Sequence, residues 1–182
     1  MGAIMSLCLA QLRSGDHIIC SSDVFGSTVV LLNNFFAKFG VEISYVKLTD
    51  MAAWRAAIKD NTRFLFIETP SNPLSQVGDI AAFADLAHQH DLLLVVDNCF
   101  CSPALQNPLA LGADIIIHSA TKYIGGHGTS IGGVIVDGGD FDWEANPERQ
   151  PKLNNPDPNY NGVVWTEAVK ALHATKAPLD GR

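Results

Sequence analysis

Residues 63–97 read RFLFIETPSNPLSQVGDIAAFADLAHQHDLLLVVD, and the order of apolar and polar residues in this stretch decides the fold. Two short apolar runs, at 63–68 and 92–97, have the length and composition of buried strands. Between them, 80–88 has apolar residues at helical spacing, and Asp79 stands where an N-cap belongs. A strand, a helix and a second strand in this order predict a βαβ unit with parallel strands.

The same alternation continues on both sides of this unit. Further apolar runs predict strands at 17–20, 41–46, 114–118 and 133–136. Helical spacing predicts a helix over 27–39, with Gly40 in the position of a C-cap. The sequence therefore predicts an α/β fold in which helices flank a mainly parallel sheet.

The last part of the chain has a different composition. From residue 137 onward it contains Gly138-Gly139, prolines at 147, 151, 156 and 158, and several asparagines, which predicts an irregular excursion. Helical spacing returns over 163–175. We therefore divide the chain into an α/β core at 1–140 and a segment at 141–182 made of the excursion and a helix.

Composition excludes several classes of function. The 182 residues carry 12 basic and 19 acidic side chains, and a formal charge of -7 repels nucleic acid. No apolar run approaches the ~20 residues that a membrane-spanning helix needs. The four cysteines lack the spacing of a disulfide framework. Residues 1–12 lack the basic residues with which a signal peptide begins. We therefore expect a cytoplasmic protein with small-molecule partners, without nucleic acid or membrane.

Polar residues follow directly after three of the predicted strands. Asp97 ends one strand, Asn72 lies in a proline-bracketed loop after another, and Ser119, Thr121 and Lys122 follow a third. In doubly wound folds, ligands bind beyond the carboxyl ends of the strands. A lysine behind a desolvated strand can attack an aldehyde, and hydroxyls can bind phosphate. Each position also has an ordinary interpretation, as a cap for Asp97 and as turns for Asn72 and Lys122.

An aromatic ring, Phe25, stands where the helix at 27–39 opens. It either stacks on a ligand or packs against its own helix as a hydrophobic staple. Together with the amine, the carboxylate and the hydroxyls, this ring completes the set of groups that pyridoxal phosphate requires.

Three motifs then carry a family resemblance. They are Glu68-Thr69-Pro70-Ser71-Asn72-Pro73, Val96-Asp97-Asn98 and His118-Ser119-Ala120-Thr121-Lys122-Tyr123. In order and approximate spacing they resemble the motifs of the Cys/Met-metabolism family of pyridoxal-phosphate enzymes, over roughly residues 1–166. The resemblance implies the large cofactor-binding domain of fold type I enzymes, with pyridoxal 5'-phosphate as the cofactor.

The resemblance also implies a role for each of these residues. Lys122 would be the catalytic residue, holding the cofactor through its amino group and then moving protons at the substrate. Asp97 would pair with the pyridine nitrogen and Phe25 would stack on the ring. Asn72 would reach the phenolic oxygen, and the hydroxyls of Ser119 and Thr121 would bind the phosphate. No metal ligand is implied.

Within the family, different parts of the chain resemble two groups of sulfhydrylases. Residues 1–123 are similar to O-succinylhomoserine sulfhydrylases, whereas 123–133 and 156–160 look more like O-acetylhomoserine sulfhydrylases. Both groups are transferases of methionine and cysteine metabolism that replace the γ-oxygen of a homoserine ester with sulfide, giving homocysteine. We expect this reaction, with the acyl group left open. A cystathionine γ-synthase or γ-lyase of the same family shares every motif and is the alternative.

Several features of the family have no counterpart in the sequence. The Ser and Gly of a phosphate-binding turn would precede Met1, and the arginine for the substrate carboxylate would follow in a C-terminal domain. Many relatives also carry Tyr where Phe25 stands. The chain thus resembles a fragment lacking both ends of an enzyme whose full-length relatives form homo-oligomers. We expect it alone to be inactive or a poor catalyst, and a catalytically inactive fragment is a further alternative.

A metal site would be a different class of function. The candidate is a site built from Cys99, Cys101, His118 and His127. Because Cys-x-Cys with distant histidines is not the usual paired spacing of zinc ligands, we predict no metal.

Overall fold

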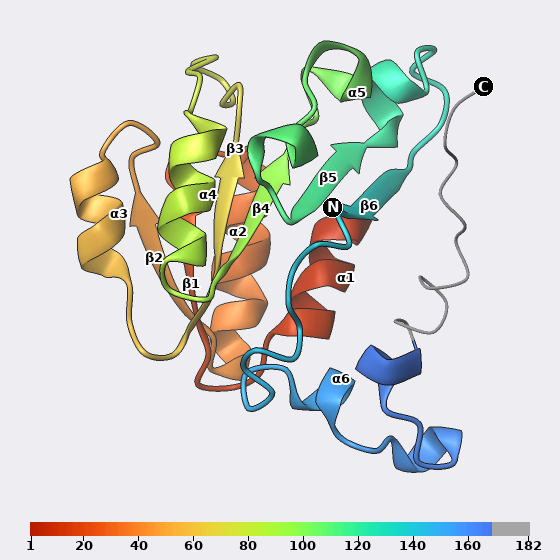
Figure 1. Cartoon of the computed structure of the whole chain (residues 1–182). Helices are drawn as coiled ribbons and strands as arrows, with labels where there is room; N and C mark the ends of the chain where they lie inside the picture. The colour runs from red at the N-terminus through yellow and green to blue at the C-terminus, as the bar shows by residue number, and fades with distance from the viewer. Residues whose placement is uncertain (169–182) are drawn as a thin grey trace. The chain divides into compact units, whose positions relative to one another are not determined.

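The computed structural model describes residues 1–168, and within them the chain forms a six-stranded sheet in the order β2-β1-β3-β4-β5-β6 (Figure 1). The strands are β1 (His17–Ser21), β2 (Glu42–Val46), β3 (Thr62–Glu68), β4 (Leu93–Asp97), β5 (Ile115–Ser119) and β6 (Gly133–Asp137). Neighbouring strands are parallel except for β5 and β6, which are antiparallel. The predicted α/β fold with a mainly parallel sheet is confirmed.

Helices cover both faces of this sheet (Figure 1). They are α1 (Gly2–Gln11), α2 (Gly26–Asn34), α3 (Met51–Ala57) and α4 (Ile80–His88). The short helix α5 (Ser102–Leu105) follows β4 and buries none of its residues. Shorter turns lie at η1 (Phe36–Phe39), η2 (Leu109–Leu111) and η3 (Ala120–Ile124). Asp79 caps α4 as predicted, because its side chain accepts a hydrogen bond from the amide of Ala82.

The helix predicted over 27–39 is divided at Phe35. There α2 ends and the tighter turn η1 continues to Gly40, whose φ of 82° closes it. The ring of Phe35 lies 5.1 Å from that of Phe36 and 5.0 Å from that of Phe39. Phe36 itself is buried. The tighter turn therefore buries Phe36 and gathers the three rings, which a uniform α-helix would space differently.

One hydrophobic cluster joins α3 and α4 to the sheet. Its centre is Trp54 of α3, whose ring meets that of Phe83 of α4 edge-on at 4.9 Å. The indole N–H of Trp54 donates to the carbonyl of Lys47 at 2.9 Å, so this buried polar group is satisfied. The cluster includes alternate residues of β3 and β4, such as Leu65 and Val96. This face of the sheet is a packed core.

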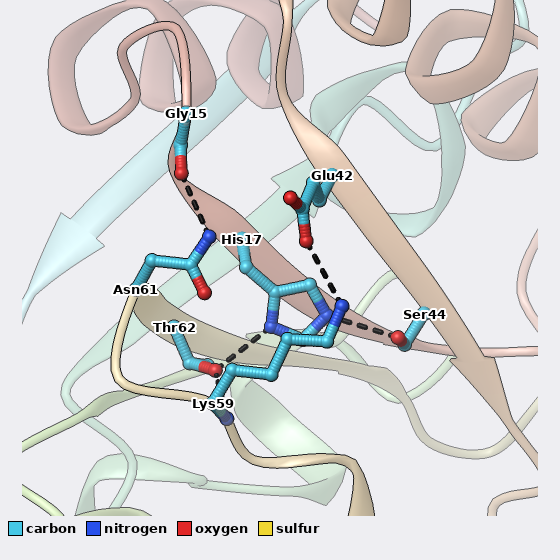
Figure 2. Close-up of polar contacts among 7 residues, drawn as sticks. All are labelled: Gly15, His17, Glu42, Ser44, Lys59, Asn61 and Thr62. Atoms are coloured by element: carbon cyan, nitrogen blue, oxygen red, sulfur yellow. Dashed lines mark hydrogen bonds and ion pairs between the residues drawn. The ribbon is translucent and has the colours of Figure 1, made fainter.

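The amino ends of β1, β2 and β3 are joined by a polar cluster around His17 (Figure 2). The buried ring of His17 has its Nδ1 2.8 Å from Thr62 Oγ1 and its Nε2 2.9 Å from Ser44 Oγ. Nearby, Lys59 Nζ lies 2.9 Å from Glu42 Oε2 in an exposed ion pair. Burial, and secondly the charge of Lys59, lowers the pKa of His17. Both ring nitrogens are bonded, which gives this histidine a structural role at the end of the sheet opposite to the carboxyl ends.

Residue contacts divide the chain into Met1–Phe141 and Asp142–Arg182. The second unit contains the short helices α6 (Pro151–Asn154) and η4 (Pro158–Tyr160). Trp165 donates its indole N–H to Asp157 Oδ2 at 3.0 Å and packs on Tyr160. The helix predicted over 163–175 extends beyond the described residues. Within the described part of the chain, no helix is long and apolar enough to cross a membrane.

Candidate active site

A cavity of about 600 Å³ opens at the carboxyl ends of the parallel strands. It lies where β3, β4 and β5 end and α2 begins, as expected for ligand sites in open α/β sheets. The six residues proposed from the sequence all line it: Phe25, Asn72, Asp97, Ser119, Thr121 and Lys122. Tertiary structure thus brings together side chains from positions 25 to 122 of the sequence. Their individual roles stay predictions.

The carboxylate of Asp97 is the most deeply placed of these six groups. Asp97 ends β4 with 8% of its surface exposed, and its Oδ1 accepts the amide of Cys99 at 3.1 Å. Burial raises its pKa to about 6, and the Cys99 amide partly opposes that shift. Among residues 1–168, no basic side chain forms an ion pair with it. A cationic group in the cavity would therefore relieve a buried, unpaired negative charge.

A second carboxylate, Glu68, lies beside Asp97. Glu68 ends β3, is 2% exposed, and is the register partner of Asp97 in the sheet. Burial, followed by the charge of Asp97, raises its pKa to about 7. Glu68 is not among the site residues predicted from the sequence, although its position at the end of a buried strand is the same signal that identified Asp97.

Phe25 and Asn72 approach the cavity from two loops. Phe25 is half exposed at the start of α2, and its amide donates to Glu68 Oε2 at 2.6 Å. The amide of Asn72 donates to the carbonyl of Asp23 at 3.2 Å, which joins the two loops. Asn72 is thus held by its backbone, and within residues 1–168 its side chain makes no hydrogen bond that a ligand would have to break.

A clasp around Gln106 ties the loop after β3 to the loop after β4. Its Nε2 donates to the carbonyl of Thr69 and to Oδ1 of Asn98, each at 2.9 Å. The side chain of Asn98, which is completely buried, donates in turn to the carbonyl of Gln106 at 2.9 Å. These bonds connect the segment that carries Asn72 to the segment that carries Asp97.

Of the two hydroxyls predicted for phosphate, that of Thr121 is already engaged. Thr121 Oγ1 donates to the carbonyl of Gly132 at 3.2 Å and accepts the amide of Gly132 at 3.0 Å. Nearby, burial is the main cause that raises the pKa of the Cys99 thiol, and the Ser119 side chain slightly opposes that shift. A phosphate would have to share or replace the hydrogen bonds of Thr121.

Lys122 follows β5 in the turn η3, where its φ of -90° and ψ of -122° depart from helical values. Its side chain lines the cavity but belongs to an exposed residue. The strand before it is desolvated, as expected, yet residues 1–168 do not desolvate the lysine itself. The described residues therefore place the Lys122 amine at the cavity but do not bury it.

The lining suits pyridoxal phosphate on structural grounds. A buried carboxylate that has no ion pair with a basic side chain of residues 1–168 suits the pyridine nitrogen, and an exposed aromatic ring suits the face of the heterocycle. A lysine on the cavity wall suits the aldehyde. Thr28 Oγ1, also in the lining, is buried without a hydrogen-bond partner, so the cavity wall retains unused polar capacity.

A metal site does not have the structural support that the described residues give to pyridoxal phosphate. The part of the chain that the structure describes contains no group of three or more His, Cys, Asp or Glu side chains arranged to hold an ion. The four cysteines are all free.

Comparisons with known proteins agree with the geometry. The sequence model of the Cys/Met metabolism PLP-dependent enzymes matches residues 1–166. O-succinylhomoserine sulfhydrylase of Pseudomonas aeruginosa is 54% identical over 140 residues, which cover 77% of this chain and 35% of that protein. Cystathionine gamma-synthase of Mycobacterium leprae is 48% identical over 126 residues, covering 69% and 32% of the two chains.

Solved structures show the same likeness. A putative O-acetylhomoserine (thiol)-lyase of Campylobacter jejuni, solved with N'-pyridoxyl-lysine-5'-monophosphate, aligns with a TM-score of 0.85 and 29% identity. The alignment covers 98% of this chain and 42% of that one. The chain therefore spans about a third of the length of its curated relatives and somewhat more of this structure.

Proposed function

Because this chain belongs to the Cys/Met metabolism family of PLP-dependent enzymes, we propose that it supplies the cofactor-binding core of an O-acylhomoserine sulfhydrylase. The observation that carries the proposal is the cavity that gathers Lys122, Asp97 and Phe25 at the carboxyl ends of the strands. The 54% identity to an O-succinylhomoserine sulfhydrylase supports this reaction over others in the family. Because the chain spans about a third of that relative, the reaction is proposed for the whole enzyme.

We assign the cofactor to the residues as follows. Pyridoxal phosphate, when bound, withdraws electrons from substrate carbons. Asp97 would keep its charge opposite the pyridine nitrogen, Phe25 would cover one face of the ring, and Asn72 would donate its amide to the phenolic oxygen. The hydroxyls of Ser119 and Thr121 would orient the phosphate.

Lys122 has two tasks in this proposal. Its amine would hold the cofactor covalently, and once displaced by the substrate's amine it would accept and return protons at the α and β carbons. In the net reaction, sulfide forms a bond to the γ carbon, the γ carbon–oxygen bond breaks, and the acyl carboxylate leaves. The products are homocysteine and succinate or acetate.

A hybrid enzyme tests the reaction. The aligned 140 residues of the Pseudomonas aeruginosa sulfhydrylase are replaced by the matching residues of this chain, and each O-acylhomoserine ester is supplied with sulfide. We expect homocysteine, measured by mass spectrometry, and its loss in the hybrid with Lys122→Ala. The acyl ester with the higher kcat/KM shows which donor the hybrid prefers.

Other products would favour the alternatives. Cystathionine formed from cysteine at a higher kcat/KM than homocysteine from sulfide would identify a γ-synthase, as in the Mycobacterium leprae relative. Ammonia and a keto acid without any acceptor would identify a lyase. A folded hybrid that makes none of these products, beside an active parent enzyme, would favour a catalytically inactive sequence.

We further propose that residues 1–140 form the cofactor-binding part and that the enzyme is a cytoplasmic homo-oligomer. The division of the structure into two units after Phe141 supports this boundary of the cofactor-binding part. The four unpaired cysteines support a reducing compartment.

The proposed assembly rests on exposed apolar side chains. Tyr123 and Ile131, which follow β5, are 69% and 96% exposed, as large apolar residues of a subunit contact often are in an isolated chain. Light scattering of the hybrid and of the 182-residue chain measures the assembly.

A further inference from the structure

The N-terminus of α2 lacks the local residues that normally complete a helix start. Its N-cap is Phe25, which has no side-chain acceptor, and the first turn contains no acidic residue. In a capping box, a Glu at the N3 position accepts the N–H of the N-cap residue. In α2 the N3 position is occupied by Thr28, whose hydroxyl is buried and unpaired. The sequence near α2 therefore leaves the amide of Phe25 without a local partner.

Glu68 supplies this partner from a distant strand. Its Oε2 accepts the Phe25 amide at 2.6 Å, although the two residues are 43 positions apart. The carboxylate also places a negative charge at the positive end of the α2 dipole. The contact is short and is made by a residue that is 2% exposed, so water competes little for it.

The position of Glu68 is unfavourable for a purely structural cap. It lies beside Asp97, and burial together with the neighbouring negative charge raises its pKa to about 7. A buried carboxylate whose pKa is raised by burial and by a neighbouring carboxylate is more typical of a functional site than of a helix end.

We propose that Glu68 is a positioning residue of this site: its carboxylate holds the backbone of Phe25 and so fixes the direction of the aromatic ring in the cavity that Asp97 also lines. The inference rests on the proposed function, because it concerns the ring that would cover the cofactor. Phe25 is 48% exposed, so its ring has few neighbours to orient it. The backbone at the start of α2 must therefore determine where the ring points.

The first test needs no cofactor. In the 182-residue chain, the amide resonance of Phe25 is followed by NMR as a function of pH. A bond to Glu68 predicts a downfield shift that titrates with a midpoint near 7, displaced from the usual range by burial and Asp97. Other titratable groups near Glu68 are the thiols of Cys20 and Cys99, whose raised pKa values put them above this range. Loss of the titration in Glu68→Gln supports the contact, and its persistence overturns it.

The second test measures pyridoxal-phosphate affinity by visible absorption in a double-mutant cycle. We expect Glu68→Ala to weaken binding about tenfold, as for a charged hydrogen bond, and Glu68→Gln, which retains an acceptor, to weaken it clearly less. In a Phe25→Ala background, Glu68→Ala should have little further effect, because it acts through that ring. If the losses in affinity caused by the two substitutions were additive, Glu68 would act directly on the cofactor or through the general structure of the chain. That result would overturn the proposal.

Asp114→Asn is the matched control. Asp114 is also a buried carboxylate that accepts a backbone amide, from Leu94 at 2.7 Å, but it is not part of the cavity lining. This change should lower stability and leave the affinity for pyridoxal phosphate unchanged. If neither the wild-type chain nor the hybrid enzyme binds pyridoxal phosphate, the proposed function and this role of Glu68 fail together. If it binds and Glu68→Ala binds equally well, the inference alone fails.

Discussion

Glu68 and Asp97 are register partners on the adjacent parallel strands β3 and β4, and both carboxylates are buried at the wall of one cavity. Parallel strands carry register partners on the same face of the sheet, so the two negative charges cannot separate. Their pKa values are raised to about 7 and about 6, in each case chiefly by burial. A cation bound in the cavity, between these two carboxylates and the solvent, would stabilise the charged form of both.

This pair makes stability depend on pH. Glu68 titrates near 4.5 when unfolded and near 7 when folded, so the folded state retains a proton that the unfolded state has lost. The resulting stabilisation is complete below about pH 4.5 and disappears as the pH rises through about 7. We expect urea denaturation to show this decline, and Glu68→Gln to reduce it. Glu148→Gln, at an exposed carboxylate, should follow the wild type, and an unchanged slope in Glu68→Gln would contradict the assignment.

His17 predicts a dependence of the opposite sign. Burial lowers its folded pKa below 6.5, so its contribution to stability is present above that value and is lost as the pH falls. Lys59 adds to the shift and Glu42 opposes it. We therefore expect Lys59→Gln to raise the pKa of His17, measured from its ring proton resonances. Lys152→Gln, in the second unit, is the control, and equal shifts in both variants would show that the nearby charge is irrelevant.

Lys122 should be the attachment point of the cofactor. After incubation with pyridoxal phosphate and reduction with borohydride, the peptide containing Lys122 should gain the mass of one pyridoxyl-phosphate group. Lys122→Ala should lose both this label and the visible absorption band, whereas Lys38→Ala should keep them. Labelling of a different lysine in the wild type would refute the assignment.

The clasp at Gln106 should contribute to the stability of the site. Gln106→Ala removes two hydrogen bonds of 2.9 Å and leaves the buried Asn98 without one of its donors. We expect a loss of about 1–3 kcal/mol in the free energy of unfolding, measured with urea. Gln89→Ala, at an exposed position, should change it by less than about 0.5 kcal/mol. If both substitutions lowered the free energy of unfolding equally, the hydrogen bonds of Gln106 would make no specific contribution to stability.

Apolar patterning was sufficient to predict the strands. The runs at 63–68 and 92–97 differ from β3 and β4 by one residue at one end, because strands buried on both faces are continuously apolar. The same patterning did not reveal α3, whose only strong local signal is its cap, Asp50, which accepts the amide of Ala53. It also failed at Phe35, because apolar residues three apart suit both an α-helix and the tighter turn.

The sequence by itself determined which residues stand behind each strand, and therefore that an amine, a carboxylate, an aromatic ring and hydroxyls would meet at one edge of the sheet. Tertiary structure decided which of these groups already have partners. The hydroxyl of Thr121 is paired with Gly132, and the amide of Phe25 is bonded to Glu68. The physical reason is distance along the chain: periodicity and capping act over a few residues, whereas the contact of Phe25 with Glu68 spans 43 and forms only once β3 and α2 are packed together.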